Sequence, residues 1–173
     1  DGGTPAFLQT IKAALCIKLK EEMTIGKIRA REEELVKYAL DGLKKIPTLH
    51  ILAGNIEHRL GAISFYVENI HYNLLVKLLN DRYGVQVRGG CSCAGTYGHY
   101  LLHVDPNRSK IITDKIDQGD LSEKPGWVRM SLHPTMTNDE LYLIIYALKQ
   151  IVENIHEWEK DYSYKPSTNE FYN

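Results

Sequence analysis

The sequence has few cysteines, no long apolar run and no excess of either charge. Its three cysteines are an odd number, and two of them are separated by a single residue, which is not the pattern of a disulfide framework. No apolar stretch approaches the roughly 20 residues that a membrane-spanning helix requires. Lys and Arg number 21 and Asp and Glu number 22. This balance argues against nucleic acid or an anionic membrane as the main partner, because both attract concentrated positive charge.

The start of the chain has no initiator methionine and no secretory signal. We therefore expect Asp1-Gly2-Gly3-Thr4-Pro5 to lie inside a longer protein. The unpaired cysteines favour a reducing, cytoplasmic location. At 173 residues, of which 43% are apolar and 25% charged, the chain fits a single globular domain with its own core.

The first 46 residues predict a long, kinked helical lead-in. Thr4-Pro5 combines a hydroxyl N-cap with proline at the first helical position. Apolar residues recur at spacings of three and four over two stretches, which are separated near Gly26 and end before Pro47. The apolar positions are Leu8, Ile11, Leu15 and Leu19 in the first stretch and Leu35, Tyr38, Leu40 and Leu43 in the second.

Strand-like and helical patterns then alternate. The predicted strands are 50–52, 62–67, 85–88 and 127–132. Leucines at 74, 75, 78 and 79 form a helical stripe that ends at Gly84. The stretch 91–126 has the weakest periodicity and contains Gly-Asp and Pro-Gly turn signals, so we predict irregular structure there.

The last helix has the clearest pattern in the sequence. Thr137 and Glu140 form a capping box, and an apolar stripe follows as far as Ile155. The tail from Tyr162 onward is polar and aromatic and is a candidate arm. The order of elements predicts an α+β fold with a small, mostly antiparallel sheet covered by helices on one face. Within it we assign 1–46 as the helical lead-in, 47–161 as an α/β sandwich and 162–173 as a tail.

The loop Arg88-Gly89-Gly90-Cys91-Ser92-Cys93-Ala94-Gly95 follows a predicted strand. Its glycines let the backbone turn sharply and approach a ligand closely. A thiol on such a loop is accessible, and the neighbouring Arg88 favours the thiolate, which is the nucleophilic form. The residues alone also fit two small polarisable side chains packed in a tight turn. Both interpretations stay open at this point.

A metal site is a different hypothesis for the same region. Cys91, Cys93, His99 and His103 are ligand types that zinc accepts, and they would make the chain a metal-binding or interaction module. The C-x-C spacing is tighter than the usual gap between zinc ligands, and no second pair of ligands is evident. The alternative for both histidines is ordinary hydrogen bonding in a loop.

Two further features suit the binding of anions. Arg129 lies in a strand with apolar neighbours, so its guanidinium either makes a structural ion pair or points into a cleft, where it binds a carboxylate bidentately. Gly2-Gly3-Thr4-Pro5, at a helix start, offers backbone N–H groups, a hydroxyl and the positive end of the helix dipole, which together suit a phosphate.

Four fragments in this order resemble the C-terminal third of the class V aminotransferases, a family that includes cysteine desulfurases and selenocysteine lyases. The fragments are GGTP at 2–5, RLGAISF at 59–65, VQVRGGCSCAG at 85–95 and GWVRMSLHP at 126–134. The resemblance implies the small C-terminal domain of a fold-type-I enzyme, a homodimer that holds pyridoxal 5'-phosphate mainly in a large N-terminal domain. In that family the cofactor-bearing lysine precedes the Gly-Thr-Pro segment, so we expect this chain alone to be inactive.

The resemblance also implies roles for individual residues. Gly3 and Thr4 match the segment that crosses the dimer interface and contacts the phosphate of the cofactor. Arg129 matches the arginine that holds the carboxylate of the amino-acid substrate, and Arg88 matches an arginine at the head of the loop. Cys93 matches the cysteine that attacks the substrate sulfur and carries it as a persulfide to an acceptor protein. These roles imply a desulfurase that converts L-cysteine to alanine.

Two features differ from the familiar desulfurases. Cys91 and Ser92 stand where histidines often precede the loop cysteine, and the stretch between Cys93 and Arg129 is longer. Transamination, or another lyase reaction on an amino acid, therefore stays open as a second reaction of the same fold. In both reactions the cofactor is organic, and no metal is expected.

Overall fold

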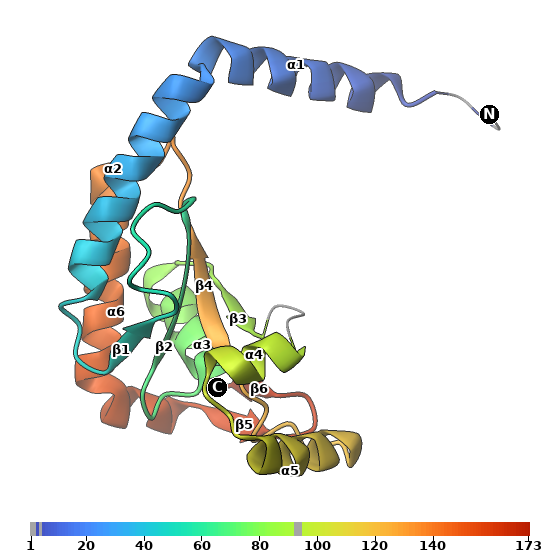
Figure 1. The fold of residues 1–173 in the computed structure, drawn as a ribbon, viewed down its shortest axis with the longest axis vertical. Coiled ribbons are helices and arrows are strands. Elements are labelled where there is room, and N and C mark those ends of the chain that lie inside the picture. Colours follow the sequence, from blue (N-terminus) through green and yellow to red (C-terminus); the bar gives the residue numbers. More distant parts are fainter. Residues whose placement is uncertain (1–2, 4, 92–94) are drawn as a thin grey trace.

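Two helices form an arm that leads into the body of the molecule (Figure 1). The computed structural model describes residues 3, 5–91 and 95–173, in which α1 spans Phe7–Met23 and α2 spans Ile25–Leu43. Thr24 separates the two helices with a φ of 61°, and its hydroxyl accepts a hydrogen bond from the Lys27 N–H. This hydroxyl caps α2, so the break falls at Thr24 and not at the predicted Gly26.

The two helices of the arm differ in burial. α1 begins at Phe7, with Ala6 at the N-cap position and no side-chain cap, and the predicted cap Thr4 lies outside the described residues. The apolar residues predicted for this helix lie within α1, but no residue of α1 is buried. α2 buries one face of its second half in the core. The buried residues of α2 are Leu35, Val36, Ala39, Leu40 and Leu43.

The body is built on four antiparallel strands in the order β1-β2-β4-β3. The strands are β1 Leu49–Ile51, β2 Ala62–Val67, β3 Arg88–Gly90 and β4 Trp127–Ser131. β4 pairs with β2 on one side and with β3 on the other. The predicted antiparallel sheet is confirmed, but the strand predicted at 85–88 begins only at Arg88, because pairing with β4 starts there.

Helices cover one face of this sheet. α3 Tyr72–Tyr83 packs against β3 and β4, and α6 Asn138–Trp158 packs against α2 and α3. Gly84 ends α3 in the left-handed conformation, and the predicted capping box of Thr137 and Glu140 starts α6. The predicted α+β fold with one helix-covered face is therefore confirmed. No helix in the described part of the chain is long and apolar enough to cross a membrane.

The connection between β3 and β4 contains two helices where irregular structure was predicted. α4 spans Gly95–Leu101 and α5 spans Pro106–Asp117. Asp105 caps α5 by accepting hydrogen bonds from two backbone N–H groups, and Pro106 follows it in the first turn. Ile112 is the only buried residue of α5. The prediction was wrong because a helix that lies on the surface needs only a weak apolar stripe.

The C-terminal tail, a candidate arm from its composition, folds back onto the body as a hairpin. After a 3-10 turn at Glu159–Asp161, β5 Ser163–Lys165 pairs with β6 Glu170–Tyr172. Asn169, only 8% exposed, donates a hydrogen bond from Nδ2 to the Tyr72 hydroxyl at 2.6 Å. The carbonyl of Asn169 accepts a hydrogen bond from Nδ2 of Asn73. These contacts fasten the hairpin to the start of α3.

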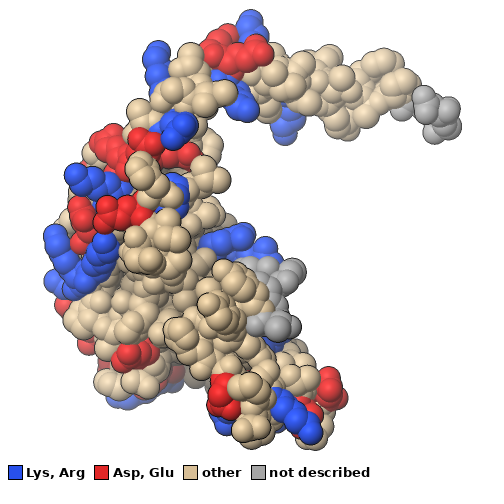
Figure 2. Space-filling model, in the orientation of Figure 1, with Lys and Arg blue, Asp and Glu red and all other residues tan. Residues whose placement is uncertain are grey.

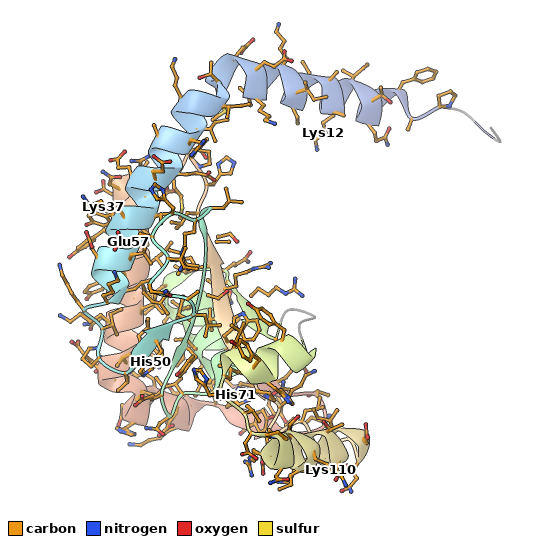
Figure 3. The ribbon with its side chains drawn as sticks, in the orientation of Figure 1. Lys12, Lys37, His50, Glu57, His71 and Lys110 are labelled. Carbon is orange, nitrogen blue, oxygen red and sulfur yellow. The ribbon has the colours of Figure 1, made fainter. Side chains whose placement is uncertain are left out.

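His71 lies where the C-terminal hairpin meets the body (Figure 3). Its ring stacks on Tyr72 at 4.4 Å between centroids, and the rings of Tyr164 and Phe171 lie 5.2 Å away. Nδ1 accepts a hydrogen bond from the Asn73 N–H at 3.1 Å and caps α3, whereas Nε2 is buried without a partner among the described residues. Burial lowers the pKa of the His71 imidazole below its ordinary value of 6.5.

The lowered pKa of His71 is expected to weaken the fold in acid. Between the ordinary pKa of 6.5 and the lowered pKa of the folded state, the unfolded chain binds a proton at His71 that the folded protein does not bind. The free energy of unfolding should therefore fall as the pH drops below the ordinary value toward the lowered one. His71→Asn keeps an N-cap acceptor and should remove this part of the pH dependence. Urea denaturation over a range of pH measures the effect. The control is His156→Asn, since the His156 side chain is 97% exposed, and equal pH slopes for His71→Asn and the unmodified protein would contradict the prediction.

Candidate active site

Two arginines lie next to each other on the sheet face that α3 and α6 leave open. Arg88 of β3 and Arg129 of β4 are Cα partners in the strand register, and Ser64 of β2 is the partner of Arg129 on its other side. Val128 and Met130 are buried in the core at 0% and 2% exposure. Because successive side chains of a strand point to opposite faces, Arg129 lies on the open face.

Gly89 shows that Arg88 shares this face. A Cβ added at Gly89 would lie 2.7 Å from Oδ1 of Asn73 and 3.0 Å from Cγ2 of Val76, so Gly89 faces α3 and has no room for a side chain. Arg88, one residue earlier, therefore points away from α3. Gly90 has a φ of 112°, a conformation that favours glycine, where the chain leaves the strand. The glycine pair thus allows both the close packing on α3 and the turn into the loop.

The arginine pair has the electrostatic properties of a carboxylate site. Arg88 is exposed and Arg129 is half-buried, and neither makes a salt bridge with any other residue that the structure describes. Two adjacent guanidiniums repel each other, and an anion bound between them removes that repulsion. Their planar N–H groups suit a carboxylate, which they bind through two parallel hydrogen bonds. The structural ion pair considered for Arg129 is not seen among the described residues, and the ligand clamp stays a prediction.

α4 covers the neighbouring end of the open face. Trp127, at the start of β4 and on the same side as Arg129, is only 5% exposed. A Cβ added at Gly98 of α4 would lie 3.2 Å from the Trp127 ring and 3.5 Å from Cβ of Cys91, so the α4 backbone packs directly over both residues. Between α4 and α5 lies a pocket of about 610 Å³, called here the α4–α5 pocket. It is lined by Cys91, His99, Tyr100, Val104, Pro106, Ser109, Thr113, Ile116, Lys124 and Pro125.

Of the other residues singled out in the sequence, Gly3 is not brought to the arginine pair. Cys93 and Thr4 lie outside the described residues. Gly3 precedes α1 and is exposed, with a φ of 117°, and the N-terminal end of α1 lies away from the sheet (Figure 1). The structure therefore joins Arg88 and Arg129 and keeps Gly3 apart from them within one chain.

The described residues form no group of three or more His, Cys, Asp and Glu side chains that could hold a metal ion. Cys91 and His99 line the α4–α5 pocket, whereas His103 is exposed, with a φ of 53°, after the end of α4. The fourth ligand of that hypothesis, Cys93, is not among the described residues.

The polar contacts of the α4–α5 pocket were not predicted from the sequence. Nδ1 of His99 and Oγ of Ser109 are 2.6 Å apart, and Lys124 lines the same pocket. The pair Asp105-Pro106 could have predicted the start of α5, because an N-cap residue followed by proline is typical of a helix start. A helix from residue 106 would have placed Ser109 in its first turn, but its position against His99 depends on tertiary packing.

Comparison with known proteins identifies relatives of this chain. The family model for aminotransferase class-V matches residues 1–144. A probable cysteine desulfurase of Halobacterium salinarum is 34% identical over 93 residues, which are 54% of this chain and 22% of the relative. A probable cysteine desulfurase 2 of Mycobacterium leprae is 28% identical over 122 residues, which are 69% of this chain and 29% of the relative. The chain thus spans less than a third of the length of these relatives.

Solved structures share the fold. A cysteine desulfurase from Thermococcus onnurineus NA1 matches with a TM-score of 0.61 and 22% identity, over 89% of this chain and 33% of that chain. The cysteine desulfurase CsdA from Escherichia coli matches with a TM-score of 0.59 and 18% identity, over 88% of this chain and 32% of that chain. The fold expected for part of a fold-type-I enzyme is confirmed.

Removing one member of the arginine pair is expected to stabilise the folded protein. Like charges directly opposite each other on neighbouring strands destabilise a sheet, so Arg88→Gln should raise the free energy of unfolding by roughly 0.2–1 kcal/mol. The gain should shrink at high salt, which screens the repulsion. Chemical denaturation at two salt concentrations measures both effects.

The control for this prediction is Arg82→Gln, which should lower stability. Arg82 pairs with Asp161 at 2.7 Å and lies over the Trp158 ring, so its removal loses attractive contacts. If Arg88→Gln also lowered stability, repulsion between the two guanidiniums would not be the dominant effect.

Proposed function

The chain belongs to the class V aminotransferase family, and we propose that it is the C-terminal domain of a pyridoxal-phosphate-dependent cysteine desulfurase. The proposed reaction converts L-cysteine to alanine and leaves the sulfur as a persulfide on Cys93. The observation that carries the proposal is the pair Arg88 and Arg129 on the open sheet face. We assign residues 1–46 as the lead-in, 47–161 as the α/β sandwich and 162–173 as the tail of this domain.

Arg129 is the proposed residue for the carboxylate of the substrate. Its half-buried position on the central part of the sheet limits the directions in which its guanidinium can point. A carboxylate held by two parallel hydrogen bonds fixes the orientation of the attached α-carbon, which aligns the bond to be broken. Arg88 adds a second positive charge beside it and favours the anionic form of both the substrate and a nearby thiol.

The residues of this chain fit a supporting role toward pyridoxal phosphate. Strand alternation places Ser64, Arg88, Arg129 and Ser131 on the open face. None of these is a lysine, and we assign the cofactor-bearing lysine, as the family resemblance implies, to polypeptide outside this chain. We assign Gly3 and Thr4 to the phosphate of the cofactor in a partner subunit. When bound, the cofactor supplies an electron sink for the charge that develops next to the substrate nitrogen.

The exposed apolar side of α1 supports a large N-terminal domain and a second subunit of a homodimer as its neighbours. Figure 2 shows that much of the surface of α1 carries no charged side chain. A folded protein rarely leaves a contiguous apolar surface of this kind in water unless it is an interface. The large apolar residues of α1 that are more than half exposed are Phe7, Leu8, Ile11, Leu15, Ile17 and Leu19.

Cys93 is the proposed nucleophile. Its thiolate would take the sulfur of the bound amino acid and hold it as a persulfide for a sulfur-acceptor protein. Cys16 and Cys91 are free thiols, which suits the reducing, cytoplasmic setting that such chemistry requires.

Replacement of Arg129 is expected to reduce activity in the protein that includes its large domain. A hydrogen bond to a charged group contributes about 1.5–3 kcal/mol, so Arg129→Lys should lower kcat/KM for L-cysteine by about 10- to 100-fold. Lysine keeps the charge but loses the planar pair of donors. Chromatographic measurement of alanine gives the rates, with Arg82→Lys, outside the site, as the control. Equal kcat/KM for Arg129→Lys and the unmodified protein would exclude a carboxylate clamp at this position.

Replacement of Cys93 separates desulfuration from the other reactions of this fold. Cys93→Ala should abolish persulfide formation from L-cysteine, because no other residue is assigned to receive the sulfur from the substrate. Mass spectrometry of the alkylated protein detects the persulfide, and Cys16→Ala is the matched control. Full persistence of alanine and sulfide release in Cys93→Ala would assign Cys93 a structural role and favour transamination or another lyase reaction.

A further inference from the structure

A second thiol, Cys91, lies two residues before Cys93 and lines the α4–α5 pocket. Cys91 is half-buried and free of a disulfide. The α4 backbone at Gly98 packs over it, since a Cβ added there would lie 3.5 Å from Cβ of Cys91. The thiol is therefore held on the wall of a cavity. A volume of about 610 Å³ is in the range that binds small molecules.

A histidine of the same pocket is held in one orientation. Nδ1 of His99 and Oγ of Ser109 are 2.6 Å apart, and both side chains come from the inserted helices α4 and α5. This contact leaves Nε2 as the ring nitrogen for proton exchange. A histidine is a suitable general base for a thiol near neutral pH.

Lys124, which follows α5 in the connection to β4, provides a positive charge to the α4–α5 pocket. It lines the α4–α5 pocket and makes no salt bridge with the residues that the structure describes. The neighbouring cations differ in this respect, because Arg108 and Lys115 both pair with Glu123. The rest of the wall is largely apolar, with Val104, Pro106, Ile116 and Pro125. The pocket therefore suits a small molecule with an apolar stem and one anionic group.

We propose that Cys91 is a relay thiol, which accepts sulfur from the Cys93 persulfide and passes it to a small carboxylate-bearing thiol bound in the α4–α5 pocket. This inference rests on the proposed function, in which Cys93 first receives the sulfur. Only Ser92 separates the two cysteines in the sequence. Lys124 binds the carboxylate of the acceptor, and His99 takes the thiol protons.

Each transfer is a thiol exchange without net oxidation. His99 removes the proton of Cys91, and the Cys91 thiolate attacks the outer sulfur of the Cys93 persulfide. The S–S bond at Cys93 breaks, a new S–S bond forms at Cys91, and Cys93 leaves as a thiolate. The thiolate of the acceptor then attacks the outer sulfur on Cys91, so the acceptor becomes a persulfide and Cys91 returns to a thiolate. His99 returns the Cys91 proton to the Cys93 thiolate after the first transfer, takes the proton of the acceptor thiol before the second, and then passes it to the Cys91 thiolate.

The relay is tested with the protein that includes its large domain, L-cysteine as sulfur donor and two matched acceptors. The acceptors are 3-mercaptopropionate, which carries a carboxylate, and 2-mercaptoethanol, which is neutral. Alanine from the first turnover reports sulfur removal from the substrate, and the acceptor persulfide reports delivery. Tandem mass spectrometry locates the sulfur, because cleavage after Arg88 and Arg108 yields both cysteines in one peptide, separate from Cys16.

Cys91→Ser is expected to leave first-turnover alanine unchanged, to keep the sulfur on Cys93 and to abolish delivery to 3-mercaptopropionate. His99→Gln should slow delivery by about 10²-fold, the usual contribution of a general base. Lys124→Gln should remove the preference for 3-mercaptopropionate over 2-mercaptoethanol. Unchanged delivery in Cys91→Ser, with alanine formation intact, would overturn the relay and leave the proposed function standing.

If the proposed function is wrong, neither the unmodified protein nor any variant forms alanine from L-cysteine. In that case cysteine persulfide replaces L-cysteine as the sulfur donor. Selective sulfur uptake by Cys91 over the exposed Cys16, lost in His99→Gln, would support a reactive thiol in the pocket. Equal uptake by Cys91 and Cys16 would overturn it.

Discussion

The pairing of β4 with both β2 and β3 is the interaction on which the rest of the molecule depends. It carries Val128 and Met130 into the core on one side and places Arg129 between Ser64 and Arg88 on the other. The burial that stabilises the sheet thus also holds a guanidinium in a defined position, because alternate residues of a strand point to opposite faces. A binding group on a packed strand keeps its geometry better than one on a loop.

The inserted helices divide the open face into two regions of different chemistry. α4 packs over Trp127 and Cys91, and the arginine pair lies two residues farther along β4 on the same face. In the proposed relay, the substrate binds at the arginine pair and the sulfur acceptor binds in the α4–α5 pocket, so the two molecules need not compete for one site.

The two ends of the chain differ in how far they pack against the body. The C-terminal hairpin packs on the start of α3, where Asn169 is buried and hydrogen-bonded to the Tyr72 hydroxyl. The apolar side of α1 finds no such cover within the described residues. The body therefore contains a complete core, whereas the arm has the surface of a helix that packs against further polypeptide.

The sequence by itself determined the elements whose signals are local. The capping box of Thr137 and Glu140, the left-handed Gly84 and the stripes of α2, α3 and α6 depend on residues a few positions apart, and the ordered motifs indicated the family. Thr4 and Cys93 were assigned by resemblance alone. The tertiary structure decided which distant residues meet: Arg88 with Arg129, His99 with Ser109, and Asn169 with Tyr72. Local periodicity cannot specify these contacts, because strand register and the packing of surface helices depend on the whole fold.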